Sequence, residues 1–213
     1  SVGSILVSVN NYRYNLPALK VFDLFFNEKN EIKNIENEMV NKNNLDFKNK
    51  IEIKNISFHY PNNKMNILRN LNFEINKGEK IGICGKSGSG KSTLLNLILG
   101  LLTPVEGSIN CDGKEIKDNI RNWYSKIGYV PQKITLFEES IKKNICFGVE
   151  QKDIKNDDFL DALKLSELNN FINSLPEKYE TNVGHEGGIV SGGQLQRIGI
   201  ARALYLKPDI LIL

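Results

Sequence analysis

The chain has 213 residues, of which 40% are hydrophobic and 25% are charged. This profile is typical of a soluble globular protein, and the length allows one domain with a hydrophobic core. The formal net charge of +3 is too small to indicate a nucleic-acid partner or an acidic substrate. No stretch reaches the roughly 18 apolar residues of a membrane span, and no signal peptide is visible.

Three cysteines, Cys84, Cys111 and Cys146, are widely spaced and match neither a metal-binding pattern nor a CxxC motif. An odd number without a disulfide framework favours a reducing compartment. Cys84 follows the apolar residues Ile81–Ile83 and is predicted to be a small core residue. We therefore expect no redox or ligand role for the cysteines.

The first 50 residues differ from the rest of the chain. Residues 1–26 are rich in apolar side chains, interrupted by Arg13 and Lys20, and their spacing is more helical than strand-like. Two interpretations stay open: an amphipathic helix of the domain itself, or the cytoplasmic end of a membrane helix with both cations on the positive inner side. Residues 27–50 are rich in Asn, Lys and Glu, which predicts a linker or a loosely held helix.

Compact structure is expected from about Ile51. Strands are predicted at residues 51–58, 71–75, 80–84, 127–130 and 210–213, the first with one break in its alternation and the third and last buried. Helices are predicted at residues 91–101 and 192–206, and residues 138–180 are predicted to be mostly helical, with Leu160, Leu163, Leu165 and Leu168 on inner faces. Alternating strands and helices predict an α/β sheet with a helical insertion.

One glycine-rich segment carries a chemical signal. Gly85-Lys86-Ser87-Gly88-Ser89-Gly90-Lys91-Ser92 matches G-x-x-x-x-G-K-[ST] at every fixed position, between a predicted strand and a predicted helix. Glycines let several backbone N–H groups point into one concavity, and the helix N-terminus adds a partial positive charge. Lys91 is expected to reach the β- and γ-phosphates, Ser92 to bind Mg²⁺, and Thr93 to support the α-phosphate. The motif predicts a site for a nucleoside triphosphate, taken as ATP, with Mg²⁺.

A second pair of glycines opens the predicted helix at residues 192–206, in Ser191-Gly192-Gly193-Gln194. Ser191 and Gln194 have the spacing of a capping box, which is a purely structural explanation. Two successive glycines weaken a helix start by about 1 kcal/mol each, which favours close approach of a ligand such as a phosphate. Both explanations stay open at this stage.

Four motifs in this order resemble those of the nucleotide-binding domain of ABC transporters, over about residues 51–213. Tyr60 resembles the aromatic residue that stacks on adenine, and Gly85–Thr93 resembles the Walker A loop. Gln132 resembles the Q-loop glutamine, which in the family contacts Mg²⁺ and senses the membrane domain. Ser191–Gln194 resembles the LSGGQ signature, with Val in place of its leading Leu.

The resemblance implies a P-loop NTPase fold with a RecA-like core, an antiparallel β subdomain and a helical subdomain at about residues 136–192. In the family, two such domains enclose two ATP molecules. Ser191, Gly192, Gly193 and Gln194 would then face the γ-phosphate held by a second copy. One chain would hold two half-sites, and a homodimer is expected.

Local sequence resembles the exporter subtype. Leu136–Ile141 and Thr181–Gly187 are similar to exporter segments, although His185 and Glu186 stand where the second segment usually has Glu-x. The resemblance implies that residues 1–26 are the cytoplasmic end of the last membrane helix, with a membrane domain fused upstream at the inner membrane and no nucleic-acid partner. Residues 11–19 are similar to flippases for lipid-linked oligosaccharides and polysaccharides.

Pro208–Leu213 resembles the approach to the Walker B motif. The resemblance places the acidic Asp-Glu pair and the H-loop His after Leu213, so the domain is expected to be incomplete at its C-terminal end, and Asp209 is not the Walker B Asp. We expect these 213 residues alone to bind ATP weakly and to hydrolyse little of it. Two alternatives stay open: a soluble ABC ATPase that acts on nucleic acid, and an ATP switch without hydrolysis.

Overall fold

The computed structural model describes residues 45–61, 65–184 and 190–213. The predicted end of a membrane helix and most of the predicted linker lie outside these ranges, as do His185 and Glu186. Within them, no helix combines the length and the apolar composition that a bilayer span requires. The structure is α/β, as predicted, with one hydrophobic core under a sheet and a second among helices.

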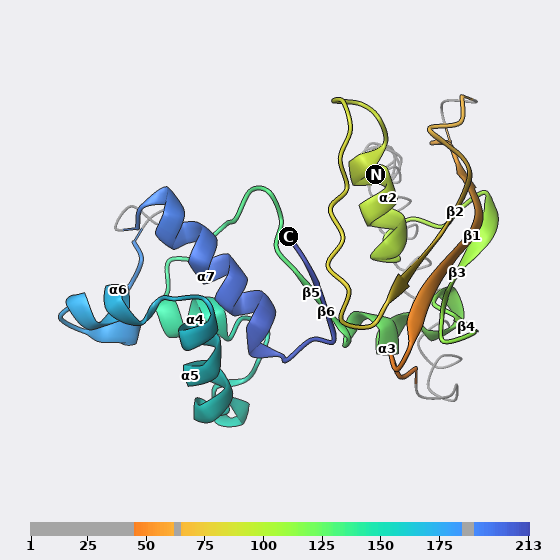
Figure 1. Cartoon of the computed structure of the whole chain (residues 1–213). Coiled ribbons are helices and arrows are strands. Elements are labelled where there is room, and N and C mark those ends of the chain that lie inside the picture. Colours follow the sequence, from red (N-terminus) through yellow and green to blue (C-terminus); the bar gives the residue numbers. More distant parts are fainter. Residues whose placement is uncertain (1–44, 62–64, 185–189) are drawn as a thin grey trace, which may run out of the picture. The chain divides into compact units, whose positions relative to one another are not determined.

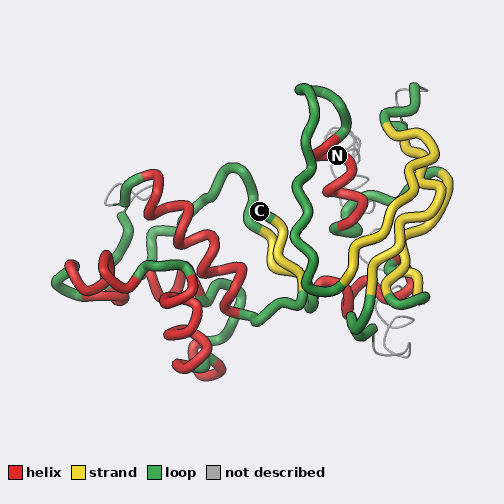
Figure 2. Tube along the Cα trace, viewed as in Figure 1, coloured by secondary structure: helices red, strands yellow, loops and turns green. Residues whose placement is uncertain are grey.

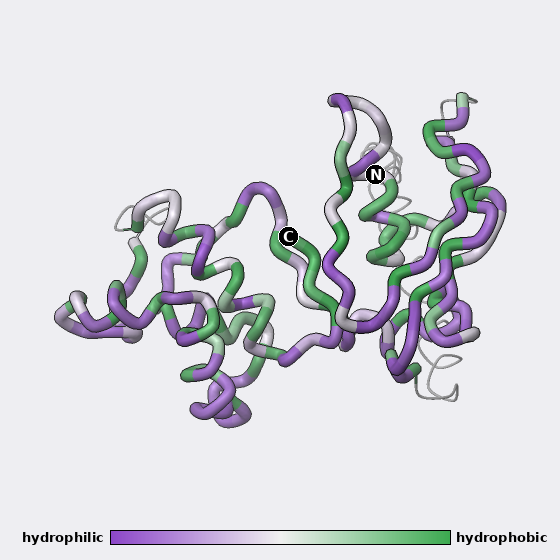
Figure 3. The backbone as a smooth tube through the Cα atoms, viewed as in Figure 1, coloured by the Kyte–Doolittle hydropathy of each residue, from purple (hydrophilic) through white to green (hydrophobic). Residues whose placement is uncertain are grey.

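Four strands form an antiparallel sheet in the order β2-β1-β3-β4 (Figures 1 and 2). They are β1 (Lys50–Phe58), β2 (Leu68–Asn76), β3 (Glu106–Cys111) and β4 (Lys114–Glu115). Hydrophobic and hydrophilic residues alternate along β1 and β2 (Figure 3). The predicted break in β1 is confirmed, because its ladder to β2 shifts register between Ile53 and Ile56. The sequence pattern missed β3, since only Ile109 and Cys111 in it are buried and apolar.

Helix α2 (Lys91–Ile98) packs against this sheet through the first core. It ends at Ile98 rather than near Leu101, because Gly100 has a φ of 76° and leaves the helical conformation. The 3₁₀ turn η1 (Lys117–Asn119) and helix α3 (Ile120–Tyr124) follow the sheet. The indole N–H of Trp123 donates to the Ile98 carbonyl oxygen at 2.8 Å, which fixes the C-terminal end of α2.

Strands β5 (Ile127–Tyr129) and β6 (Ile210–Ile212) form a parallel pair, which confirms both predicted strands. The predicted burial of the last strand is wrong, because Leu211 and Leu213 are exposed. Within the described ranges β6 pairs only with β5, so no third strand covers its other side.

The prediction of a buried strand at Lys80–Cys84 is also wrong. This segment is extended without ladder partners, and Ile81 and Ile83 are 46% and 38% exposed. Cys84 is exposed as well, so it is not a core residue. An apolar run becomes a buried strand only where neighbouring strands pair with it, and none of the described strands does so.

The helical part contains α4 (Ile141–Ile145), η2 (Gln151–Asp153), α5 (Asn156–Leu165), α6 (Asn169–Ser174), η3 (Lys178–Glu180) and α7 (Gly192–Tyr205). Their buried residues form the second core, in which α7 contacts both α4 and α5 (Figure 1). The mostly helical stretch and the helix from Gly192 are therefore confirmed.

Two of the four leucines predicted on inner faces are buried, Leu163 and Leu168, whereas Leu160 and Leu165 are exposed. The inner face of α5 is formed by Phe159, Ala162 and Leu163, at the i, i+3, i+4 spacing of one helix face. Leu160 and Leu165 fall outside that stripe, which is why the prediction fails for them.

Packed structure begins ahead of Ile51. Leu45 and Phe47, which belong to the segment predicted as a linker, are buried in the first core. The last residues of that segment are therefore part of the folded domain.

Candidate functional site

The phosphate loop, Gly85–Ser92, joins the extended segment 79–85 to α2. Gly88 and Gly90 have φ values of 77° and 89°, a left-handed conformation that glycine adopts without strain. A Cβ on Gly90 would lie 3.0 Å from Ile67 Cγ2, and one on Gly85 would lie 2.7 Å from Ser89 Oγ. A side chain at Gly90 would therefore require Ile67 and Leu68 to shift, and one at Gly85 would require the Ser89 side chain to rotate.

Lys91 crosses the loop from the first turn of α2. Its ammonium group donates to the carbonyl oxygens of Gly85 and Lys86, both at 2.8 Å. No acidic residue lies in the first turn of α2, so the partial positive charge of the helix N-terminus adds to the ammonium. Lys86, Ser87 and Ser89 are exposed on the same loop. This arrangement suits an anion such as a phosphate group.

Ser92 and Thr93 follow Lys91 in the first turn of α2. Ser92 is exposed, so its hydroxyl is free to bind a cation, whereas Thr93 is buried. The described ranges contain no cluster of three or more His, Cys, Asp or Glu side chains suited to a metal ion. A hard cation here would therefore take its ligands from Ser92 and from phosphate oxygens, which fits Mg²⁺ with a bound triphosphate.

Tyr60, just after β1, lies next to this helix. Its hydroxyl is 3.5 Å from Thr93 Oγ1, and its ring packs edge-on against Phe58, with the ring centroids 5.1 Å apart. Tyr60 is 40% exposed, so part of this residue is open to a ligand. The structure thus places Tyr60 beside the first turn of the helix that follows the phosphate loop.

Gln132 is placed differently. It is exposed in the loop after β5, and among the described residues no hydrogen bond joins it to Ser92 or to any other part of the phosphate loop. Its role at the candidate Mg²⁺ site therefore stays a prediction.

The predicted capping box at the start of α7 is confirmed. Ser191 Oγ accepts from the Gln194 N–H at 3.3 Å, and Gln194 Oε1 accepts from the Ser191 N–H at 2.7 Å. A Cβ on Gly192 or Gly193 would meet no atom of the described residues within 4 Å. Packing within the described part of the chain therefore requires neither glycine, and it leaves the backbone here open to an incoming group.

The start of α7 borders an open cavity of about 790 Å³. Its lining includes Ser191, Gly193, Gln194 and Arg197, with Asn169, Asn170 and Ser174 of α6 opposite. Arg197 pairs with Glu167 at 3.3 Å on the rim. The starts of α2 and α7 lie apart (Figure 1), so one chain carries two separate groups of candidate residues.

Sequence reasoning missed one polar cluster, which is centred on the buried side chain of Asn144. Arg202 in α7 donates to the carbonyl oxygens of Asn144 at 2.8 Å and Thr135 at 3.2 Å. The Asn144 side chain, itself buried, binds both the N–H and the carbonyl oxygen of Phe137. Burial lowers the pKa of Arg202, although a guanidinium group stays charged. The cluster joins α7 to the segment that follows Gln132; an arginine within the apolar run of α7 was its one sequence signal.

A glycine-rich loop that leads into a helix, with a lysine of that helix bonded to the carbonyl oxygens of the loop, defines a P-loop NTPase when it lies within an α/β fold. The family model described as "ABC transporter" matches residues 68–213. The chain therefore belongs to the ABC transporter family.

Its relatives include exporters. The ABC transporter ATP-binding protein YfiB of Bacillus subtilis is 44% identical over 165 residues, which cover 77% of this chain and 28% of that protein. ATP-binding cassette sub-family B member 5 of Homo sapiens is 41% identical over 165 residues, which cover 76% of this chain and 13% of that protein. A solved structure, described as a bacterial Atm1-family ABC exporter with ATP bound, is 35% identical with a TM-score of 0.69, covering 76% of this chain and 28% of that one. The chain spans less than a third of the length of these relatives.

Proposed function

We propose that this chain belongs to the ATP-binding domain of an exporter, and that the complete protein hydrolyses ATP at the cytoplasmic face of the cell's inner membrane. The observation that carries the proposal is the pairing of a lysine-bridged phosphate loop with an open, capped helix start of the signature type. Membership of the ABC transporter family supports it. A membrane domain fused upstream would supply the transport path.

Each residue has a role that follows from its position. The Lys91 ammonium would exchange its two carbonyl partners for phosphate oxygens. The Ser92 hydroxyl would bind Mg²⁺, which supplies neutralisation of the phosphate charge. The Tyr60 ring would stack on adenine, with Thr93 fixing its hydroxyl. Gln132, exposed in the loop after β5, would contact the same Mg²⁺.

The starts of α2 and α7 would act in different sites of a homodimer. Within one chain they lie apart (Figure 1), so the signature of one copy would close over the phosphate loop of the other. Gly193 leaves space for this approach, because nothing lies within 4 Å of the position of its missing Cβ. The backbone N–H groups at the start of α7 would then face the γ-phosphate.

Complementation of two variants of the complete protein tests this arrangement. Lys91→Ala removes the loop cation, and Gly193→Asp places a negative charge where the phosphate would lie, in space that the fold leaves open. Each variant alone should lose ATP hydrolysis. A mixed dimer contains one intact pair, Lys91 of one copy and Gly193 of the other, so mixing should restore activity. A mixture no more active than its components would contradict the composite site.

The transported substrate is proposed from the similarity of residues 11–19 to flippases of lipid-linked oligosaccharides. A lipid or a lipid-linked glycan is the substrate class that this similarity supports. Vesicles that contain the complete protein should move a fluorescent lipid-linked oligosaccharide with ATP but not with the Lys91→Ala variant. Normal ATP hydrolysis without translocation of this probe would exclude the substrate class and leave the ATPase proposal standing.

A further inference from the structure

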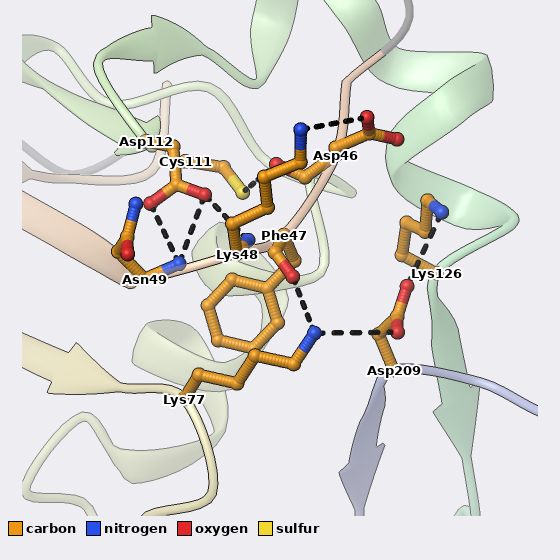
Figure 4. A network of polar contacts seen from close by, with 9 residues as sticks. All are labelled: Asp46, Phe47, Lys48, Asn49, Lys77, Cys111, Asp112, Lys126 and Asp209. Carbon is orange, nitrogen blue, oxygen red and sulfur yellow. Dashed lines mark hydrogen bonds and ion pairs between the residues drawn. The ribbon is translucent and has the colours of Figure 1, made fainter.

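The residues that lead into β1, 45–50, form what we call the leading segment, and one carboxylate holds its backbone. The N–H groups of Lys48 and Asn49 donate to the Asp112 carboxylate, at 3.0 Å for Asn49 (Figure 4). The N–H group of Lys50 donates to the same carboxylate at 2.8 Å. Asp112 lies in the turn between β3 and β4 and has a φ of 46°. Three consecutive N–H groups on one anion fix the path of the segment as well as its position.

Lys77 holds the same segment through a different atom. Its ammonium group donates to the Phe47 carbonyl oxygen at 2.7 Å and lies 5.5 Å from the centroid of the Phe47 ring. It also lies 4.0 Å from the carboxylate of Asp209, which pairs with Lys126 at 3.2 Å (Figure 4). One chain of contacts thus runs from Phe47 to Lys126.

These side chains stand at the beginnings of three segments of the chain, of which the first enters the phosphate loop. Lys77 follows β2, in the turn before the extended segment that enters the phosphate loop. Asp209 directly precedes β6, and Lys126 directly precedes β5, beyond which Gln132 lies. The leading segment is therefore connected to the residues that precede three segments, and one of these segments enters the phosphate loop.

Burial of two apolar side chains further restricts the movement of the leading segment. Leu45 and Phe47 are buried in the first core, so the segment cannot shift without disturbing the packing. Between them, the Asp46 carbonyl oxygen accepts from the Cys111 thiol at 3.8 Å. Burial raises the pKa of that thiol to about 11, so it remains a protonated donor at neutral pH. The leading segment is bound to move together with the sheet.

We infer that Asp112, Lys77, Asp209 and Lys126, here called the leading-segment anchor, transmit movement between the chain upstream of residue 45 and the ATP site. Asp112 and Lys77 act as positioning residues, since they hold the segment and do not lie in the phosphate loop. The inference rests on the proposed function, because it requires ATP to bind at Gly85–Ser92. A purely structural anchor would stabilise the fold but would not respond to nucleotide.

Hydrogen exchange at the backbone amides of residues 46–50 tests this inference in the complete protein in lipid nanodiscs, with and without ATP and Mg²⁺. Asp112→Gly removes the carboxylate and accepts the positive φ, whereas Asp112→Asn keeps one acceptor oxygen. Asp118→Asn removes the same charge from an exposed position and is the matched control. Lys77→Met removes the hydrogen bond to the Phe47 carbonyl oxygen, and it tests the inference independently if Asp112→Gly does not fold.

In the wild type and in Asp118→Asn, nucleotide should slow exchange in the leading segment. Asp112→Gly should speed exchange at residues 48–50 at least about tenfold and abolish the nucleotide response, while ATP affinity stays within about twofold. The exchange rate in Asp112→Asn should lie between those of the wild type and Asp112→Gly. An unresponsive wild type that binds ATP, or a response that survives both Asp112→Gly and Lys77→Met, would overturn the inference. A wild type that binds no ATP would overturn the proposed function, and the inference with it; a preserved response without ATP hydrolysis would overturn only the proposed ATPase activity.

Discussion

The hydroxyl of Tyr60 and Oγ1 of Thr93 lie 3.5 Å apart, which joins the end of β1 to the first turn of α2. The two residues are 33 positions apart in the sequence, and the Phe58 ring packs edge-on against the tyrosine ring. This contact holds an aromatic ring beside the loop that is proposed to bind phosphate. It gives the proposed adenine-stacking role of Tyr60 a geometric basis.

Two substitutions of Tyr60 should distinguish the contribution of its ring to ATP binding from that of its hydroxyl. Tyr60→Ala removes the stacking surface, worth about 0.5–1.5 kcal/mol, so ATP should bind roughly two- to tenfold more weakly. Tyr60→Phe keeps the ring and should bind ATP almost as the wild type does. Titration with a fluorescent ATP analogue measures both, and Tyr124→Ala, at another exposed tyrosine, is the control. Equal losses in the Ala and Phe variants would show that the hydroxyl matters rather than the ring.

Gly90 and Gly88 form a matched pair in the phosphate loop. Both have positive φ, so alanine at either position should cost about 1–2 kcal/mol of backbone strain. Only at Gly90 would the new Cβ crowd Ile67 and Leu68, at 3.0 and 3.1 Å. Thermal denaturation should therefore show a larger loss of stability for Gly90→Ala than for Gly88→Ala. Equal losses would mean that the close packing at Gly90 has no energetic effect.

Ser191 has two proposed roles that two substitutions can separate. Ser191→Ala removes the cap of α7 and should lower the free energy of unfolding by about 1 kcal/mol. Ser191→Asp keeps a capping oxygen but adds a negative charge near the proposed γ-phosphate position. It should match the wild type in chemical denaturation and yet lower ATP hydrolysis by the complete protein. If Ser191→Asp hydrolyses ATP at the wild-type rate, Ser191 acts only as the cap of α7 and the phosphate-facing role is wrong.

The contact between Asp112 and the leading segment should weaken in acid. Desolvation raises the pKa of Asp112, but hydrogen bonds from the N–H groups of Lys50, Lys48 and Asn49 outweigh it and hold the pKa below the ordinary aspartate value. A lowered pKa in the folded state stabilises the fold above the ordinary value, and this stabilisation is lost as the pH falls through the lower one. The stability of the wild type should therefore decline more steeply than that of Asp112→Asn in this acidic range, as measured by urea denaturation. Parallel declines would contradict the assignment.

Local patterns were sufficient for a large part of this fold. β1, β2 and α7 follow their periodicity, and the capping box of Ser191 and Gln194 depends only on residues within one helical turn. The phosphate loop was predictable because its glycines and Lys91 interact over a short stretch of chain.

Features that depend on distant partners could not be predicted in the same way. Lys80–Cys84 has the composition of a buried strand, but composition does not reveal whether a neighbouring strand pairs with it. The bonds of Arg202 to Asn144 and of Asp112 to Lys50 join residues 58 and 62 positions apart. Neither pair leaves a periodic signal, so only the folded structure reveals these contacts.

The central claim is that Gly85–Ser92 binds the phosphates of ATP, and isothermal titration of ATP with Mg²⁺ against the wild type and Lys91→Ala tests it most directly. A hydrogen bond to a charged group contributes about 1.5–3 kcal/mol, so Lys91→Ala should weaken ATP binding at least about tenfold. Lys164→Ala, which removes an exposed lysine of α5, should leave the affinity unchanged. Equal ATP affinity in the wild type and Lys91→Ala would contradict the account.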